Sequence, residues 1–209
     1  MEQLAQQFRA LANHNRIRIL RLLCVLGEMN VTRLAEATGL VVPLVSDHLR
    51  ILTTAGWTRR RRSGRLVYYR PADEDNGAVA TAVWAALRSA FSDVHSTDPR
   101  VVADADQAHS ATRSDQALFA YFTAFTHPRR LQIIQCLNKE QPVVVGELAS
   151  RLSMSPLACL RHVDKLMRRS FVRRRRSTDG TGYALRRGNG REARQMLEAV
   201  RVGVSAGSG

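Results

Sequence analysis

Apolar residues recur every three or four positions along the first half of the chain, the spacing that puts side chains on one face of an α-helix. Successive stripes of this kind predict four helices before residue 55 and a fifth over about 79–94. The stripes consist of Leu4, Phe8, Leu11, Ile17, Leu20, Leu23, Leu34, Val45, Leu49, Leu52, Val79, Val83, Leu87, Phe91 and Val94. Asn13 is a typical N-cap for the second helix and Gly39 a typical C-cap for the third. Pro43 suits the first turn of the fourth helix, which is expected to end near Thr54.

The pattern changes between the fourth and fifth helices. Two short runs with strand character, Trp57–Arg62 and Arg65–Arg70, lie on either side of Ser63 and Gly64. Strand runs separated by a short turn sequence of this kind predict a β-hairpin. The first half is therefore predicted to be mostly α-helical with one small β-hairpin.

The second half of the chain repeats the first. Moving the sequence by 114 positions without gaps aligns Arg16 with Arg130 and the run Arg59–Ser63 with Arg173–Ser177. About 14 residues are identical over about 54 aligned positions, whereas chance gives about three or four. One register held along several elements indicates a duplicated domain.

The expected domains are residues 1–95 and 113–209, joined by a small, polar linker at 96–112. The linker is expected to be coil that spans roughly 20 Å. The second hairpin is expected to have a longer tip, from Thr178 to Gly182. The predicted fold class is α+β, mostly α with small β-hairpins, in two tandem domains.

Charge adds the first functional indication. Lysine and arginine number 32 against 18 aspartates and glutamates, which gives a net charge of +14. The two predicted domains carry +5 and +11, and the linker carries −2. Such an excess makes a polyanion the expected partner, and the second domain its stronger electrostatic partner. No apolar run approaches the roughly 20 residues that span a membrane, and three widely spaced cysteines give no disulfide framework, so a cytoplasmic, nucleoid-associated protein without a membrane partner is expected.

Two helices joined by a tight turn and followed by a basic hairpin make a winged helix-turn-helix. The second helix of the pair enters the DNA major groove, and the hairpin contacts the backbone or the minor groove. A plain helical bundle explains the apolar stripes, but it does not explain four consecutive arginines on each hairpin. Double-stranded DNA is therefore the predicted partner, with a non-sequence-specific architectural or RNA-binding protein as the alternative. An enzyme is disfavoured, because the sequence has no Gly-rich phosphate loop, metal cluster or nucleophile–base set.

The same segments resemble the ArsR/SmtB family of bacterial transcriptional repressors, here as a tandem pair. ALANHNRIRILRLL and VTRLAEATGLVVPLVSDHLRILTTAGW carry the resemblance in the first half, and AFTHPRRLQIIQCL and VGELASRLSMSPLACLRHVDKLMRRSF carry it in the second. It covers about residues 4–94 and 115–200. The resemblance implies a DNA-binding repressor whose dimer is built from the first and last helices of each domain.

The metal sites of that family are not matched. Its thiolate site is a Cys-x-Cys at the start of the third helix, where this chain has Asn30-Val31-Thr32 and Val144-Val145-Gly146. These side chains do not bind soft metals. The last helices also lack the spaced histidines and carboxylates of the family's zinc site. We therefore expect no metal and no cofactor, and the sequence leaves any small-molecule effector unknown.

The predicted DNA contacts lie on the outward faces of the two recognition helices and on the hairpins. They are Leu44, Ser46, Asp47, Arg50, Arg59, Arg60, Arg61, Arg62 and Arg65 in the first domain, and Leu157, Leu160, Arg161, Asp164, Arg173, Arg174, Arg175 and Arg176 in the second. Among the helix residues, only Arg50 and Arg161 offer the bidentate contact to guanine. Because the outward faces of the two helices differ, the two half-sites are expected to differ.

Two questions stay open in the sequence. The two domains pair either within one chain, as a pseudo-dimer, or as a homodimer of tandem chains. Cys24, Cys136 and Cys159 are interpreted as small buried hydrophobes, with a thiol switch as the alternative. His48 and His162 are placed on inward faces, as satisfied core or phosphate-contact residues.

Overall fold

A computed structural model describes residues 1–72, 78–92, 94–104, 111–140, 142–177, 180–186 and 190–206. The first half contains α1 (Glu2–Leu11), α2 (His14–Leu26), β1 (Met29–Asn30), α3 (Val31–Thr38), α4 (Val42–Thr54), β2 (Thr58–Ser63), β3 (Leu66–Pro71) and α5 (Ala78–Phe91). After α6 (Pro99–Ala103), the second half contains α7 (Ala111–Ala124), α8 (Pro128–Lys139), β4 (Val143–Val144), α9 (Val145–Arg151), α10 (Pro156–Arg168), β5 (Val172–Ser177), β6 (Gly180–Leu185) and α11 (Arg191–Ala206). The chain is mostly helical with small antiparallel sheets, as the sequence predicts.

The 114-residue repeat holds in the structure. Each element of the first half from α2 to β3 begins 114 residues before its counterpart in the second half, from α8 to β6. The predicted caps are present as well. The side chain of Asn13 accepts a hydrogen bond from the backbone N–H of Arg16, and Gly39 ends α3 with a φ of 69°. The helix after the first hairpin is shorter than predicted, because α5 ends at Phe91.

Each hairpin has a third strand that the sequence did not predict. The strand orders are β1-β3-β2 and β4-β6-β5. β1 and β4 have two residues each, too short to show a strand pattern in the sequence. The prediction of a longer tip for the second hairpin is wrong, because Gly180 to Gly182 belong to β6. Ser177 pairs with Gly180 in the second hairpin as Ser63 pairs with Leu66 in the first, so both strand pairs close at the same register.

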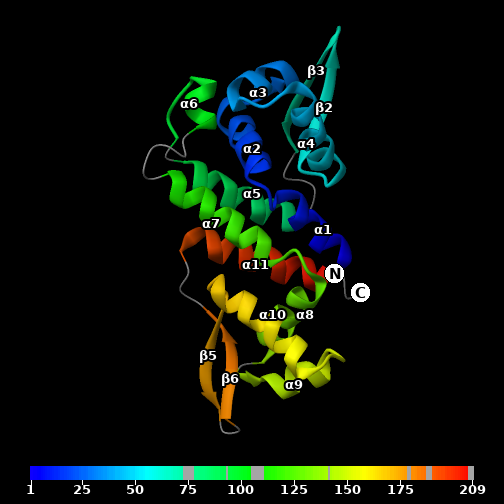
Figure 1. Ribbon diagram of the computed structural model, residues 1–209, viewed down its shortest axis with the longest axis vertical. Helices are drawn as coiled ribbons and strands as arrows, with labels where there is room; N and C mark the ends of the chain where they lie inside the picture. Colours follow the sequence, from blue (N-terminus) through cyan, green and yellow to red (C-terminus); the bar gives the residue numbers. More distant parts are fainter. Residues whose placement is uncertain are drawn as a thin grey trace.

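The first and last helices of the two halves pack against each other. α5 lies along α11, α1 contacts α7 and α8, and the two hairpins point to opposite ends of the molecule (Figure 1). The ring of Phe8 on α1 lies 5.2 Å from that of Phe125, just after α7, and 6.5 Å from that of Phe122. One hydrophobic core therefore extends through both halves.

The segment expected to be a coil linker contains α6, which packs against α2 and α3. Asp98 caps it by accepting a hydrogen bond from the backbone N–H of Arg100. Two of its own residues, Val102 and Ala103, are buried. A helix of five residues is too short to show a periodic pattern in the sequence. Its conformation depends instead on its packing against α2 and α3.

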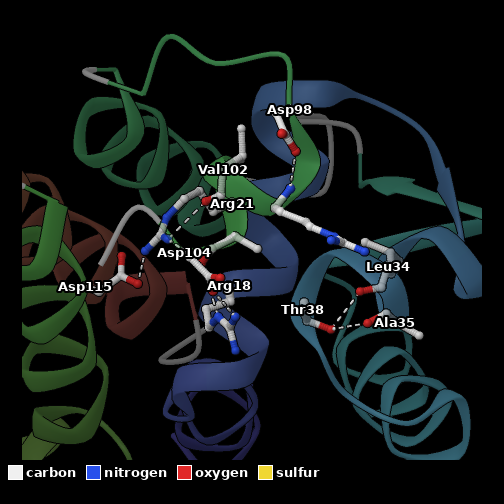
Figure 2. A network of polar contacts seen from close by, with 11 residues as sticks. Arg18, Arg21, Leu34, Ala35, Thr38, Asp98, Val102, Asp104 and Asp115 are labelled. Carbon is white, nitrogen blue, oxygen red and sulfur yellow. Dashed lines mark hydrogen bonds and ion pairs between the residues drawn. The ribbon is translucent and has the colours of Figure 1, made fainter. Parts of the chain in front are cut away.

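A buried ion pair joins the two halves beside α6 (Figure 2). Arg21 on α2 pairs with Asp115 on α7, and their side chains are 1% and 5% exposed. Arg21 also donates hydrogen bonds to the backbone oxygens of Val102 at 3.3 Å and Ala103 at 3.1 Å. Its guanidinium lies 5.5 Å from the ring centroid of Phe91 on α5. The first half, the segment after it and the second half thus meet at one arginine.

Candidate nucleic-acid interface

The outward face of α4 is arranged as the sequence predicts. Val45, His48, Leu49 and Leu52 are buried, whereas Leu44, Ser46, Asp47 and Arg50 are exposed. Arg50 forms an exposed ion pair with Asp47 at 3.3 Å. Since an exposed pair contributes little stability, the guanidinium of Arg50 can exchange this carboxylate for another acceptor.

The outward face of α10 is narrower than predicted. Leu157 and Arg161 are exposed, but Leu160 and Asp164 are half-buried, and Leu160 packs against the core. Sequence analysis missed Lys165 on the same helix, which is exposed. The residue of α4 that corresponds to Lys165 is Ile51, so comparison of the two repeats did not indicate a basic residue at this position.

In the first half, the basic hairpin is partly neutralised by a carboxylate. Arg59, Arg60, Arg61, Arg62 and Arg65 are all exposed. Arg61 donates hydrogen bonds to Glu28 at 2.6 and 3.2 Å, and its guanidinium lies 5.4 Å from the ring centroid of Tyr68. This hydrogen bond lowers the pKa of Glu28 and raises the pKa of Arg61. The charge of one arginine of the run is therefore partly balanced by a carboxylate of the protein itself.

The hairpin of the second half lacks this carboxylate. Pro142 occupies the position that corresponds to Glu28. Arg173, Arg174, Arg175 and Arg176 are exposed, and their partners across the strands are Ala184, Tyr183, Gly182 and Thr181. The electrostatic asymmetry between the halves therefore includes the hairpins, where the second copy offers more arginine to a polyanion.

Not every repeated arginine faces outward. Arg16 donates hydrogen bonds to the backbone oxygens of Ala10 and Arg9, and Arg130 donates to those of Ala124 and Thr123. Each side chain thus satisfies carbonyl groups at the end of the preceding helix. These two identities maintain the turn between two helices in both halves.

The histidines of the recognition helices have unlike surroundings. His48 is 8% exposed, and neither of its ring nitrogens has a hydrogen-bond partner in the described part of the chain. It is therefore not a satisfied core residue there, and the alternative of a phosphate contact stays a prediction. The ring of His162 lies against that of His127, with 4.5 Å between the centroids and the ring planes tilted by 46°. The Nδ1 atom of His127 accepts a hydrogen bond from the backbone N–H of Arg129 and so caps α8. Burial is the largest cause of a lowered pKa at all three histidines, and neighbouring arginines lower it further.

Cysteines and metal ligands give no second kind of site within the described residues. Burial raises the pKa of Cys24 to about 12 and that of Cys159 to about 11, and it also raises the pKa of Cys136. Such thiols are poor nucleophiles. In the segments that the structure describes, no three histidine, cysteine or carboxylate side chains gather as metal ligands would. Asn30, at the position of the family's thiolate site, caps α3 by accepting from the backbone N–H of Arg33.

Within the described residues, no helix combines the length and the apolar character that crossing a membrane requires.

Comparisons with known proteins agree with this arrangement. Residues 13–56 match the sequence model of the bacterial regulatory protein, arsR family, and residues 127–180 match that of the MarR family. The HTH-type transcriptional regulator Rv0324 of Mycobacterium tuberculosis is 38% identical over 103 residues, which cover 49% of this chain and 43% of the relative. The HTH-type transcriptional regulator KmtR of the same organism is 42% identical over 67 residues, 32% of this chain and 51% of the relative.

A third relative is the cadmium resistance transcriptional regulatory protein CadC homolog of Staphylococcus aureus, 36% identical over 70 residues, which cover 34% of this chain and 58% of the relative. The chain thus spans about half the length of the curated relatives that it matches. No solved structure matches. The matches and the repeated winged arrangement together identify an ArsR-family helix-turn-helix in residues 13–56 and a MarR-type helix-turn-helix in residues 127–180.

Proposed function

We propose that this protein is a transcriptional repressor that binds double-stranded DNA with both of its winged helix-turn-helix units, residues 1–95 and 113–209, in the cytoplasm. The observation that supports this most directly is an exposed helix beside an exposed hairpin of four arginines, present twice in one register. α4 and α10 enter the major groove, and the hairpins contact phosphates. The matched relatives are themselves named as transcriptional regulators.

The two units act as a pseudo-dimer within one chain. The buried pair of Arg21 and Asp115 supports this, because a buried charge that loses its partner is strongly unfavourable. The repeat has no second copy of this pair, since Gln135 corresponds to Arg21 and Met1 to Asp115. Two identical first units in a symmetric dimer would therefore leave Arg21 without this carboxylate.

The operator is asymmetric. Asp47 of α4 corresponds to Arg161 of α10, and Arg50 corresponds to Asp164. A carboxylate accepts from cytosine, whereas a guanidinium donates to guanine, so the two helices favour different bases. A single chain then covers two unlike half-sites about one helical turn apart.

The test is selection of bound sequences from a random DNA pool, followed by affinity measurements on the selected site and on random DNA. We expect a single asymmetric site bound at least about 10³-fold more tightly than random DNA, with one chain per site by light scattering. A ratio near one would refute sequence recognition and indicate an architectural protein. A palindromic site with two chains would refute the pseudo-dimer and indicate a homodimer of tandem chains.

A further inference from the structure

We propose that the groove between α1 and the C-terminal half of α4 binds a small phosphate ester. The groove has a volume of about 480 Å³. Its lining comes from α1, α4 and the start of α2, and it includes Gln3, Gln6, Gln7, Arg9, Arg16 and Arg50. It thus offers three guanidinium groups and three amide groups, and among the described residues no carboxylate lines it.

Arg16 is the preorganised anchor of this site. It is half-buried, and its Nε and Nη2 atoms are held by the backbone oxygens of Ala10 and Arg9. Burial lowers the pKa of this guanidinium, and carbonyl oxygens neutralise it less than an anion would. A phosphate in the groove would supply the missing negative charge, with two or three charge-assisted hydrogen bonds.

The other two guanidinium groups are available at low cost. Arg9 pairs with Glu2 at 3.0 Å and Arg50 pairs with Asp47 at 3.3 Å, and all four side chains are largely exposed. Because exposed ion pairs contribute little stability, a dianionic phosphate can displace both carboxylates. The Nε atom of Arg9 also donates a hydrogen bond to the backbone oxygen of Thr126. This bond holds the guanidinium of Arg9 at the wall of the groove.

The shape of the groove favours a small molecule over the DNA backbone. Its volume lies within the range of small-ligand sites, which a sugar phosphate or a nucleoside monophosphate would suit. The phosphates of a straight duplex lie on a convex surface and meet protruding side chains, such as those of the hairpins. The amide groups of Gln3, Gln6 and Gln7 match the hydroxyl groups of a sugar.

The second half does not repeat the site. Ala120 corresponds to Gln6, Tyr121 to Gln7 and Asp164 to Arg50. The ring of Tyr121 packs against Phe171 at 5.4 Å, and Asp164 would repel an anion. One site per chain is therefore expected.

This site would make DNA binding sensitive to a metabolite. Arg50 lines the groove and also belongs to the proposed DNA-contacting face of α4, so a bound phosphate ester and the operator compete for one guanidinium. Linkage requires that each then weakens binding of the other by the same factor. This consequence rests on the proposed function, whereas ligand binding itself does not.

Titration calorimetry on the full chain without DNA tests the site. The probes are inorganic phosphate, ribose 5-phosphate and AMP, with ribose and adenosine as uncharged controls. We expect saturable binding of a phosphorylated probe at one site per chain with a Kd below about 1 mM. No saturable binding of any of the three probes, or equal binding of the uncharged controls, would overturn the proposal.

Two isosteric variants place a negative charge in the groove: Gln3→Glu and Gln6→Glu. Each variant should weaken binding of the phosphorylated probe at least about tenfold, since like charges a few ångströms apart repel strongly at a partly dry surface. Gln116→Glu, on the exposed side of α7 and outside the groove, is the matched control and should bind as the parent does. If both groove variants keep the parent's affinity, the phosphate binds elsewhere and this assignment is wrong.

A competition experiment with the selected operator separates the two proposals. The probe that binds should raise the apparent Kd for DNA in the parent, and it should do so far less in Gln3→Glu. An equal effect in both proteins would mean simple ionic screening and would overturn the regulatory coupling. A chain that binds the probe but no DNA would refute the proposed function and leave the phosphate site standing.

Discussion

Removing the carboxylate of Asp115 is the sharpest perturbation of the joint between the two halves. In Asp115→Ala, Arg21 keeps its hydrogen bonds to the backbone oxygens of Val102 and Ala103, but its charge stays buried at 1% exposure without a counterion. Breaking one side of a buried pair typically costs about 3–5 kcal/mol. Because domains have only about 5–15 kcal/mol of stability in total, we expect the free energy of unfolding to fall by about a fifth or more.

The matched control is the ion pair of Arg18, one turn before Arg21 on α2. Arg18 on α2 pairs with Asp104 after α6, but the carboxylate is 50% exposed and the arginine 18% exposed. Asp104→Ala removes the same kind of group from the same neighbourhood, and it should cost only about 0–1 kcal/mol, the usual value for an exposed pair.

Urea unfolding followed by circular dichroism measures both variants. An apolar double variant, Arg21→Met with Asp115→Leu, should recover most of the loss, because replacing a whole buried pair is often neutral or stabilising. The recovery is further favoured since the Oδ1 atom of Asp115 has no hydrogen-bond partner within the described residues. If Asp115→Ala costs no more than Asp104→Ala, the pair does not hold the halves together and the argument for a pseudo-dimer loses its main support.

Three further predictions concern DNA binding and pH. Replacing Arg173–Arg176 by alanine should weaken binding to all sequences and lower the slope of log affinity against log salt by about 2, since about half of the four side chains on a strand face the phosphates; an unchanged slope would contradict the role of this hairpin. Arg161→Ala should relax base preference in one half of the selected operator and Arg50→Ala in the other, each by about 1–3 kcal/mol, and a base-by-base substitution series would show equal effects in both halves if the operator were symmetric. Burial lowers the pKa of His127 in the folded state, so its neutral form stabilises the fold above about pH 6.5 and this contribution is lost as the pH falls towards the lowered value. His127→Asn, the residue that the first half has as Asn13, keeps a helix cap and should flatten the fall in unfolding free energy between about pH 7 and pH 5; a curve of unchanged steepness would exclude this histidine as a cause.

Local signals in the sequence determined most of the helices and the caps of α2 and α3. Leu4, Phe8 and Leu11 keep one spacing along α1, and Asn13 caps the next helix with its own side chain, so these features depend on residues close together. The register of the repeat also needed no structure, because a duplicated chain keeps its element order. The same holds for the exposed face of α4, where the buried stripe leaves only one face for Arg50.

Contacts between distant segments decided the rest. Nothing near Arg21 in the sequence marks it as buried, since its partner Asp115 is 94 positions away and a lone arginine on a helix is usually solvated. The conformation of residues 99–103 depends on the apolar surface of α2 and α3 beneath Val102. Glu28 pairs with Arg61 because it directly precedes β1, and β1 pairs with β3 of the hairpin. Periodicity and caps are short-range properties that a sequence displays directly, whereas burial of a charge and pairing of a carboxylate require the packed chain, which brings together residues that the sequence keeps far apart.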